Sequence, residues 1–375
     1  MTRKVAIALG LVLAVILLLT LGPAPFLIGL MTALAPVPFY VLLALWLDRH
    51  EPEPRHLLLQ AFVWGMLAAS TISLVMNAAV VAYLQLSIGL DDGLVHRLAQ
   101  VLASPVFEEL SKGAAIFFLF RRERHEFDNV MDGAVYAAMV GLGFAATENV
   151  LYYGQAGMAR LAFVFALRGL ASPFAHPLFT AMTGMGFGWA REATTVRQGV
   201  IRVLGGLTAA IGLHMLWNAA GAAHMFTWAY ALIMVPTFAG VLLLLQGTIS
   251  RERRLVRERM HLLPQLLDGS EIDELCGHAG VRGWLQRRFA GGAARDAAIA
   301  VHRVRRGAVE LAFAARHADR DGAGAGRAQG GVGSHAAASA DSRVAAFHAN
   351  FEEALAGWRA DRHAARTISA RPEDH

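Results

Sequence analysis

The sequence predicts an all-α membrane protein: a polytopic bundle of about eight transmembrane helices with a partly helical, partly disordered cytoplasmic C-terminal tail. Three observations predict this class. The chain is 55% hydrophobic and only 17% charged, whereas a soluble protein carries about 25% charged residues. Long apolar runs fill residues 1–250. Residues 251–375 are instead rich in arginine, alanine and glycine, and they carry most of the net charge of +5.

The apolar runs define the predicted spans, because a helix needs about 20 apolar residues to cross the hydrocarbon core. The first run follows Arg3 and Lys4 and is longer than the apolar core of a cleavable signal peptide, about 7–15 residues, so it is expected to remain as a span. Pro173 predicts a kink in the sixth run. The predicted spans are 5–22, 26–47, 57–87, 97–120, 130–153, 161–189, 201–222 and 224–247.

Basic residues predict the orientation, since cytoplasmic segments of membrane proteins are enriched in lysine and arginine. With the amino terminus inside, only Arg97 and Arg160 lie in outer connections. The inner segments and the start of the tail hold Arg3, Lys4, Arg49, Arg55, Arg121, Arg122, Arg124, Arg191, Arg197, Arg202, Arg251, Arg253, Arg254, Arg257 and Arg259. Both termini are therefore expected in the cytoplasm, with the bundle in the inner (plasma) membrane.

Two domains are predicted: a transmembrane domain over 1–250 and a basic cytoplasmic tail over 251–375. A Gly/Ala/Ser-rich stretch near 322–340 is typical of a flexible linker. Contact of the tail with anionic membrane lipid is the simpler interpretation of its charge, and no nucleic-acid partner is expected. The single cysteine, Cys276, excludes an intrachain disulfide and a Cys-rich zinc site.

Two adjacent acids, Glu108 and Glu109, interrupt the fourth predicted span. A charge at the centre of a membrane helix costs about 2.5–3.5 kcal/mol on insertion scales, so such residues mark candidate functional sites. Glu108 and Lys112 are four residues apart and can pair on one helix face. Glu109 lies about 100° around the helix and needs another partner. A purely structural ion pair therefore explains Glu108 but not Glu109.

Further polar residues lie in the next two spans. Glu148 and Asn149 end the fifth span, where an interfacial position is the alternative to a buried one. Arg168 in the sixth span is the expected counter-ion for a surplus carboxylate. His176 follows between two prolines, whose freed backbone groups a membrane helix tolerates beside a hydrated cavity.

His214 and Asn218 lie one turn apart in the seventh span and are expected to face the same point. With the predicted topology, the acids and histidines of four successive spans can all lie in the outer half of the membrane. The sequence therefore predicts one polar cavity with Glu108, Glu109, His176, His214 and Asn218 as catalytic residues, and with Lys112, Glu148, Asn149 and Arg168 as supporting residues.

Two water-activating mechanisms fit these residues, and their spacing does not choose between them. In one, His176, His214 and Glu109 bind Zn²⁺ and a second glutamate acts as general base. In the other, which needs no metal, a buried glutamate activates water with help from histidine while Asn218 stabilises the oxyanion. The cofactor is thus either absent or zinc. No His-Glu-x-x-His motif is present.

The order of these motifs resembles the PrsW family of bacterial membrane proteases. The matching motifs are Glu108-Glu109 with Lys112, the stretch from Gly143 to Tyr152, His176, and His214 to Asn218. The resemblance covers about residues 30–250 and makes domain 1–250 protease-like. It implies cleavage of a membrane-anchored, single-span protein near or within the bilayer, with regulatory anti-sigma factors as the best-known substrate class.

The same motifs resemble the CAAX-prenyl proteases more distantly, through the paired glutamates and a His-x-x-x-Asn motif. Gly113 stands where that group has an arginine, so prenyl-peptide processing is not expected. Two other functions remain open from the residues: a proton-coupled transporter that uses the buried acids and histidines as a relay, and a non-catalytic scaffold. Transporters often carry inverted repeats, and the sequence shows no internal repeat.

Overall fold

The computed structural model describes residues 3–47, 53–124 and 126–261, together with Glu352, Ala356 and Arg359. All regular elements in this part of the chain are helices, which confirms the all-α class. The chain forms two compact units, Met1–Gln246 and Gly247–His375. The predicted linker near 322–340 lies outside the described residues, and the domain division at residue 250 stays a prediction.

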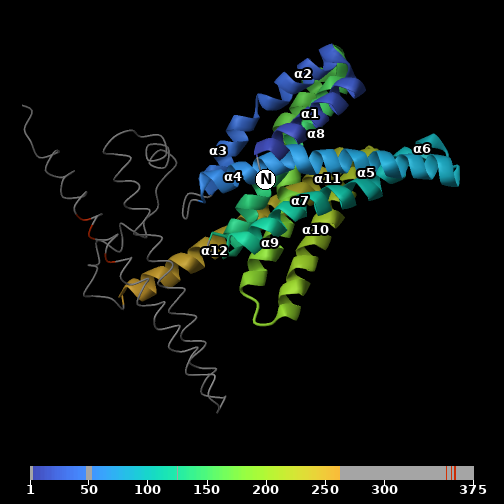
Figure 1. Cartoon of the computed structure of the whole chain (residues 1–375). Helices are drawn as coiled ribbons and strands as arrows, with labels where there is room; N and C mark the ends of the chain where they lie inside the picture. The colour runs from blue at the N-terminus through green and yellow to red at the C-terminus, as the bar shows by residue number, and fades with distance from the viewer. Residues whose placement is uncertain are drawn as a thin grey trace, which may run out of the picture. The chain divides into compact units, whose positions relative to one another are not determined.

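Three helices form the amino-terminal part of the first unit, and they pack against α8 (Figure 1). They are α1 (Arg3–Leu21), α2 (Pro23–Leu34) and α3 (Val37–Leu47). Gly22 has a positive φ of 80°, which glycine adopts without strain and which separates α1 from α2. Leu13, Leu17 and Ala33 are buried in one cluster with Val150 and Tyr153 of α8.

The next apolar run is one continuous helical segment of 34 residues, seen in Figure 1 from α4 to α5. Its parts are α4 (Arg55–Val63), the π-helical η1 (Trp64–Ala69), α5 (Ser70–Tyr83) and the π-helical η2 (Leu84–Ile88). A second segment then carries the acidic pair. It consists of α6 (Asp92–Leu98), the π-helical η3 (Ala99–Ala103) and α7 (Ser104–Arg122).

The following helices form a tight pair, α8 and α9. The elements are α8 (Val130–Phe165), the π-helical η4 (Ala166–Ala171) and α9 (Ala175–Arg191). Gly157 has non-helical φ and ψ of 64° and 164° inside α8. The chain changes direction at Gly157. The rings of Tyr153 and Phe165 show this, because they are twelve positions apart in the sequence and lie only 5.9 Å apart. The backbone is irregular again around the proline of Ser172–Phe174, next to His176.

The last described elements are α10 (Val196–Ala222), α11 (Phe226–Ala229), the π-helical η5 (Tyr230–Met234) and α12 (Val235–His261). Figure 1 shows α9 and α10 side by side, joined by a short turn. Thr195 caps the start of α10, since its side chain accepts a hydrogen bond from the Gln198 amide.

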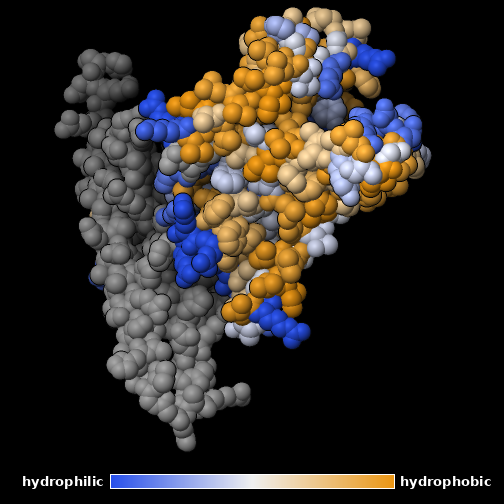
Figure 2. All heavy atoms as spheres, turned by 45° about the vertical axis from the view of Figure 1, so that its right-hand side comes forward, coloured by the Kyte–Doolittle hydropathy of each residue, from blue (hydrophilic) through white to orange (hydrophobic). Residues whose placement is uncertain are grey.

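The outer surface of the bundle is apolar. Leu19 and Leu86 are 82% and 86% exposed, and Figure 2 shows that hydrophobic residues cover most of the coloured face. Six helical segments of the described chain are long and apolar enough to cross a membrane. The segment ending in α7 is not among them because of its charges, and α8 and α9 are counted within one segment, Val130–Arg191. The chain is a multi-pass membrane protein; the number of eight spans stays a prediction.

Gly141 sets the distance between α8 and α9 beside the candidate site. A Cβ atom at this position would lie 2.7 Å from the Pro177 Cα atom and 2.8 Å from the His176 carbonyl carbon. These atoms belong to the backbone and cannot move aside by a rotamer change. The close approach of the two helices therefore needs glycine at this position.

We expect Gly141→Leu to lower the free energy of unfolding by about 1–3 kcal/mol or more, as overpacking does. Gly212→Leu is the matched control, because nothing lies within 4 Å of a Cβ atom there. The thermal unfolding midpoint of both variants in detergent measures the difference. Equal midpoints would show that the α8–α9 contact does not limit stability.

Candidate functional site

Three charged side chains of α7 lie fully inside the bundle. Glu108, Glu109 and Lys112 are 5%, 0% and 0% exposed. The Lys112 Nζ atom lies 2.9 Å from Glu109 Oε1 and 3.5 Å from Glu108 Oε2. The pair expected between Glu108 and Lys112 is thus present, but the shorter contact is to Glu109. One ammonium group lies between two carboxylates.

Glu109 obtains its remaining partners from two other helices. Its Oε2 atom accepts a hydrogen bond of 3.2 Å from the Thr180 hydroxyl on α9. Its Oε1 atom lies 3.0 Å from His214 Nδ1 on α10. A fully buried carboxylate is tolerable only when charges and hydrogen bonds compensate its lost hydration. Together with Lys112 on α7, these contacts complete the set of partners of Glu109.

Glu108 faces the opposite nitrogen of the same histidine. Its Oε2 atom is 3.8 Å from His214 Nε2, and its Oε1 atom accepts a hydrogen bond of 2.6 Å from the Ser104 hydroxyl. His214 is therefore held at Nδ1 by one carboxylate and directs Nε2 towards another. A carboxylate behind the non-ligating nitrogen of a histidine is the usual arrangement around protein-bound metals.

His176 is the second imidazole of the cluster. Its Nε2 atom lies 2.6 Å from Glu148 Oε2, and its Nδ1 atom lies 3.1 Å from Lys112 Nζ. Arg168 pairs with Glu148 and donates from Nε to Asn149 Oδ1 at 2.8 Å. Arg168 is thus the counter-ion of Glu148, the role predicted for it. The two imidazole rings have centroids 5.1 Å apart.

Aromatic rings wall the charged groups. Lys112 Nζ lies 3.8 Å from the centroid of the Phe144 ring, and the Arg168 guanidinium lies 3.7 Å from that of Tyr152. The Phe179 ring stacks on His214 at 4.9 Å. Ring faces attract cations and fix their position. The walls thus hold Lys112, Arg168 and His214 in place.

The donor atoms are close enough for a shared cation. One ligand atom from each of Glu108, His176 and His214 lies within 4.8 Å of the others. Tetrahedral zinc ligands at about 2.0–2.1 Å from the metal are roughly 3.4 Å apart, so small side-chain rotations suffice. The set differs in its carboxylate from the predicted ligands, which included Glu109.

The charges of the cluster also fit a cation. Three carboxylates (Glu108, Glu109 and Glu148) contact two cations (Lys112 and Arg168). With both histidines neutral, the cluster carries one surplus negative charge. An added metal ion or a proton on a histidine compensates this charge in a low-dielectric interior.

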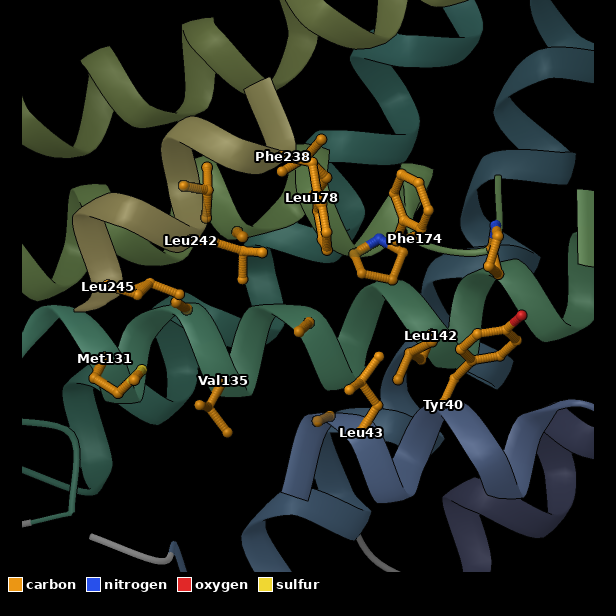
Figure 3. A pocket seen from close by; sticks show the side chains of 17 residues that line it. Tyr40, Leu43, Met131, Val135, Leu142, Phe174, Leu178, Phe238, Leu242 and Leu245 are labelled. Atoms are coloured by element: carbon orange, nitrogen blue, oxygen red, sulfur yellow. The ribbon is translucent and has the colours of Figure 1, made fainter. Parts of the chain in front are cut away.

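Among the described residues, a polar cavity borders this cluster and an apolar pocket lies elsewhere in the bundle. The polar cavity, of about 380 Å³, lies between η1–α5, η3–α7 and α8, and both Glu108 and Glu148 line it. The apolar pocket, of about 120 Å³, lies between α3, α8, α9 and α12. Figure 3 shows its wall of Leu43, Val135, Leu142, Leu178 and Leu242. Of these two cavities, the polar one reaches Glu108 and Glu148, so water and substrate are expected to approach the cluster from that side.

Comparison with known sequences agrees with this arrangement. Residues 53–241, half of the 375-residue chain, match the family described as PrsW family intramembrane metalloprotease. The chain belongs to the PrsW family. Every residue of the cluster lies within the matched range.

Three curated relatives carry the name Protease PrsW. The relative from Geobacillus kaustophilus is 33% identical over 152 residues, 40% of this chain and 61% of the relative. Those from Oceanobacillus iheyensis and Bacillus subtilis are 30% and 31% identical over 39% and 38% of this chain. The chain covers 62% and 60% of their lengths, so about three fifths of each relative is matched. No solved structure gives a significant match.

A second buried polar group includes Glu53, the first residue of the region that matches the PrsW family. This group was not predicted from the sequence. The Tyr136 hydroxyl donates to Glu53 Oε2 at 2.5 Å, and Asp132 forms a capping box with Asn129 at the start of α8. Asp132 lies sixteen residues from Glu148, or about 24 Å along a helix. This group therefore joins the segment before α4 to α8 and does not belong to the cluster. The Asn-x-x-Asp spacing was its available signal.

Asn218 is the one predicted catalytic residue that lies apart from the others. Its Nδ2 atom donates to the backbone carbonyl of Gln100 in η3 at 2.9 Å, and no hydrogen bond joins it to the cluster within the described residues. The Ser104 amide bonds to the Ala99 carbonyl, so the next π-helical donor for Gln100 would be Pro105, which has no N–H. Asn218 replaces this missing donor and ties α10 to η3.

We expect Asn218→Ala to lower the unfolding free energy by about 0.5–1.5 kcal/mol, the net contribution of one hydrogen bond that is not buried. Pro105→Ala restores an N–H group and should suppress much of this loss in the double variant. Thermal unfolding of the two single variants and the double variant measures the coupling. Strictly additive losses would contradict the assignment and leave the oxyanion role as the explanation for Asn218.

Three more contact residues of this PrsW-family chain escaped sequence reasoning: Ser104, Thr180 and Asn77. Ser104 and Thr180 each lie four residues from a named site residue, on the same helix face, and this spacing was a usable signal. Asn77 Nδ2 donates to the Ser104 hydroxyl at 2.8 Å. Its place on α5, in a different span, could not be read from spacing.

Proposed function

We propose that this PrsW-family chain is an intramembrane endopeptidase that hydrolyses a peptide bond in a membrane-anchored protein. The observation that carries the proposal is the meeting of Glu108, His176 and His214 beside a polar cavity inside an apolar bundle. Buried ionisable groups at membrane depth are costly and mark functional sites. Family membership favours peptide hydrolysis over proton transport as their use.

Glu108, His176 and His214 would hold a divalent cation such as zinc. A bound zinc ion polarises the scissile carbonyl and makes water a better nucleophile. Lys112 contacts Glu108 and His176 in the present arrangement. Its ammonium group is therefore expected to move aside when a metal ion binds.

The remaining polar residues orient the histidines and move protons. Glu109 fixes the ring of His214 through Nδ1, and Arg168 holds Glu148 in place. Glu148 lines the cavity with 20% of its side chain exposed. We assign it the general-base role: it takes a proton from water as the water oxygen adds to the carbonyl carbon. It then gives this proton to the leaving nitrogen as the C–N bond breaks.

The substrate proposed is a single-span membrane protein, and a regulatory anti-sigma factor is the class that the resemblance implies. The proposed location is the inner (plasma) membrane with both termini in the cytoplasm. The excess of basic residues in the predicted inner segments supports this orientation. Membrane lipid is the expected partner of the apolar surface.

Metal content and cleavage together test the proposal. We expect the purified full-length protein to bind about one zinc ion, and His214→Gln to lose both the zinc and the cleavage of a reconstituted single-span substrate. His56→Gln is the control, because His56 is exposed. Full cleavage by metal-free protein in chelator would exclude the metal route. Intact zinc binding without cleavage of any single-span substrate would contradict the peptidase function.

A further inference from the structure

The wall of the polar cavity formed by α5 is a line of small polar residues. Ser70, Ser73 and Asn77 all line the cavity. The two hydroxyls are already bonded, since Ser70 Oγ donates to the Gly65 carbonyl and Ser73 pairs with Ser111. Asn77 is therefore the member of this line that retains an unused polar atom.

Hydrogen-bond chemistry decides which atom of the Asn77 amide is unused. Ser104 has one hydroxyl proton and donates it to Glu108 Oε1, with 2.6 Å between the two oxygen atoms. Ser104 can then only accept from its other neighbour, so Asn77 places Nδ2 towards it at 2.8 Å. The Asn77 Oδ1 atom is left buried without a partner among the described residues.

An unsatisfied buried oxygen is costly, and a donor that enters the cavity would recover that cost. The backbone N–H groups of an α-helical substrate are already bonded within the helix. A locally unwound peptide presents free N–H groups. The free acceptor beside Glu108 therefore suits an unwound segment and not an intact transmembrane helix.

We propose that the polar cavity binds an unwound segment of the substrate and that Asn77 Oδ1 accepts one of its backbone N–H groups. Through Ser104, the same amide holds Glu108 in position next to that segment. Asn77 is thus a specificity-determining and positioning residue. The inference rests on the proposed function, because it names how the substrate of that site is bound.

Cysteine labelling tests this binding without any need for cleavage. Cys276 is the only cysteine, so a Cys276→Ser chain is a clean background. Leu74→Cys places a thiol on the cavity wall. Val75→Cys places one on the neighbouring residue, which is 54% exposed on the apolar surface. In lipid nanodiscs, a water-soluble thiosulfonate should label the first at least about tenfold faster, because thiol reactivity needs access and a polar environment.

Two single-span peptides of 24 residues serve as probes, identical except for a central Gly-Gly or Ala-Ala pair. We expect the Gly-Gly peptide to slow labelling of Leu74→Cys at least about fivefold. Asn77→Ala should raise the Gly-Gly peptide concentration that gives half-maximal protection about tenfold, because the variant loses one hydrogen bond to the peptide. Asn77→Gln, which keeps both the amide donor and the oxygen acceptor, should retain more of the protection than Asn77→Ala.

Several outcomes would overturn the inference: no protection by the Gly-Gly peptide, equal protection by both peptides, or protection unchanged in Asn77→Ala. Unchanged labelling of Val75→Cys shows that the variants are folded. Cleavage of a substrate without protection at Leu74→Cys contradicts the inference alone. Protection without cleavage of any single-span substrate contradicts the proposed function alone.

Discussion

Glu108→Gln is expected to lower the cleavage rate of a single-span substrate at least about 100-fold. The carboxylate faces the cavity and His214 Nε2 at once, so no neighbour can replace it. Loss of the general base, the role assigned to Glu148, costs about 10²–10⁴-fold in rate. Glu108 is a proposed metal ligand, and its loss would remove the ion on which that step depends, so the rate should fall by at least as much. The measurement is the initial rate in proteoliposomes at equal amounts of folded protein.

Glu192→Gln is the matched control, because Glu192 is exposed at the end of α9, and its rate should stay unchanged. Glu109→Gln separates the two adjacent acids. Glu109 does not line the cavity and acts through His214 and Lys112. Its replacement should therefore lower the cleavage rate about 10- to 100-fold, as is usual for a residue that hydrogen-bonds to a metal ligand. A larger loss in Glu109→Gln than in Glu108→Gln would reverse the proposed roles.

Lys112→Met should have opposite effects on the stability of the metal-free protein and on its affinity for zinc. The variant leaves two buried carboxylates without their cation, and breaking a buried pair costs about 3–5 kcal/mol. It also removes the group that competes for Glu108 and His176. We expect a lower unfolding midpoint without metal and a zinc affinity raised about tenfold or more.

Lys4→Met is the matched control, since Lys4 is the only other lysine and is exposed. Zinc affinity is measured by competition with a chromophoric chelator, and unfolding is followed with and without zinc. Zinc should raise the midpoint of Lys112→Met more than that of the parent chain. An unchanged zinc affinity in Lys112→Met would show that the ammonium does not compete with the metal.

The fold class could be predicted because lipid imposes a single requirement, apolar side chains along each span, and composition reveals it. The pairing of Glu108 with Lys112 could be predicted because both lie on one helix at fixed spacing. The partners of Glu109 on other helices could not be predicted. They come from α9 and α10, and their approach depends on side-chain packing between helices.

The role of Asn218 shows a second limit. Its spacing from His214 predicts that both side chains face the same point, which is wrong: His214 meets Glu109, whereas Asn218 bonds to a carbonyl of η3. That carbonyl lacks a donor only because the helix widens to a π turn just before Pro105. A π-helical turn holds one residue more than an α-helical turn, and neither the hydropathy nor the charge pattern of the sequence reveals it. The polar line on α5 was likewise missed because Ser70, Ser73 and Asn77 matter only through the cavity they face.

The placement of the buried cations bears on how the protein enters the lipid bilayer during its synthesis. Lys112 lies one turn from Glu108 and Glu109, so α7 can leave the translocation channel with much of its acidic charge already neutralised. Glu148 on α8 is neutralised once Arg168 has been inserted, because the change of chain direction at Gly157 brings Arg168 next to Glu148. The counter-ions thus lie on the acidic helix α7 itself or on η4, which directly follows α8, and insertion need not await the histidines. The cluster of Glu108, His176 and His214 is complete only once α10 has joined, because α10 carries His214, so the proposed metal site forms last.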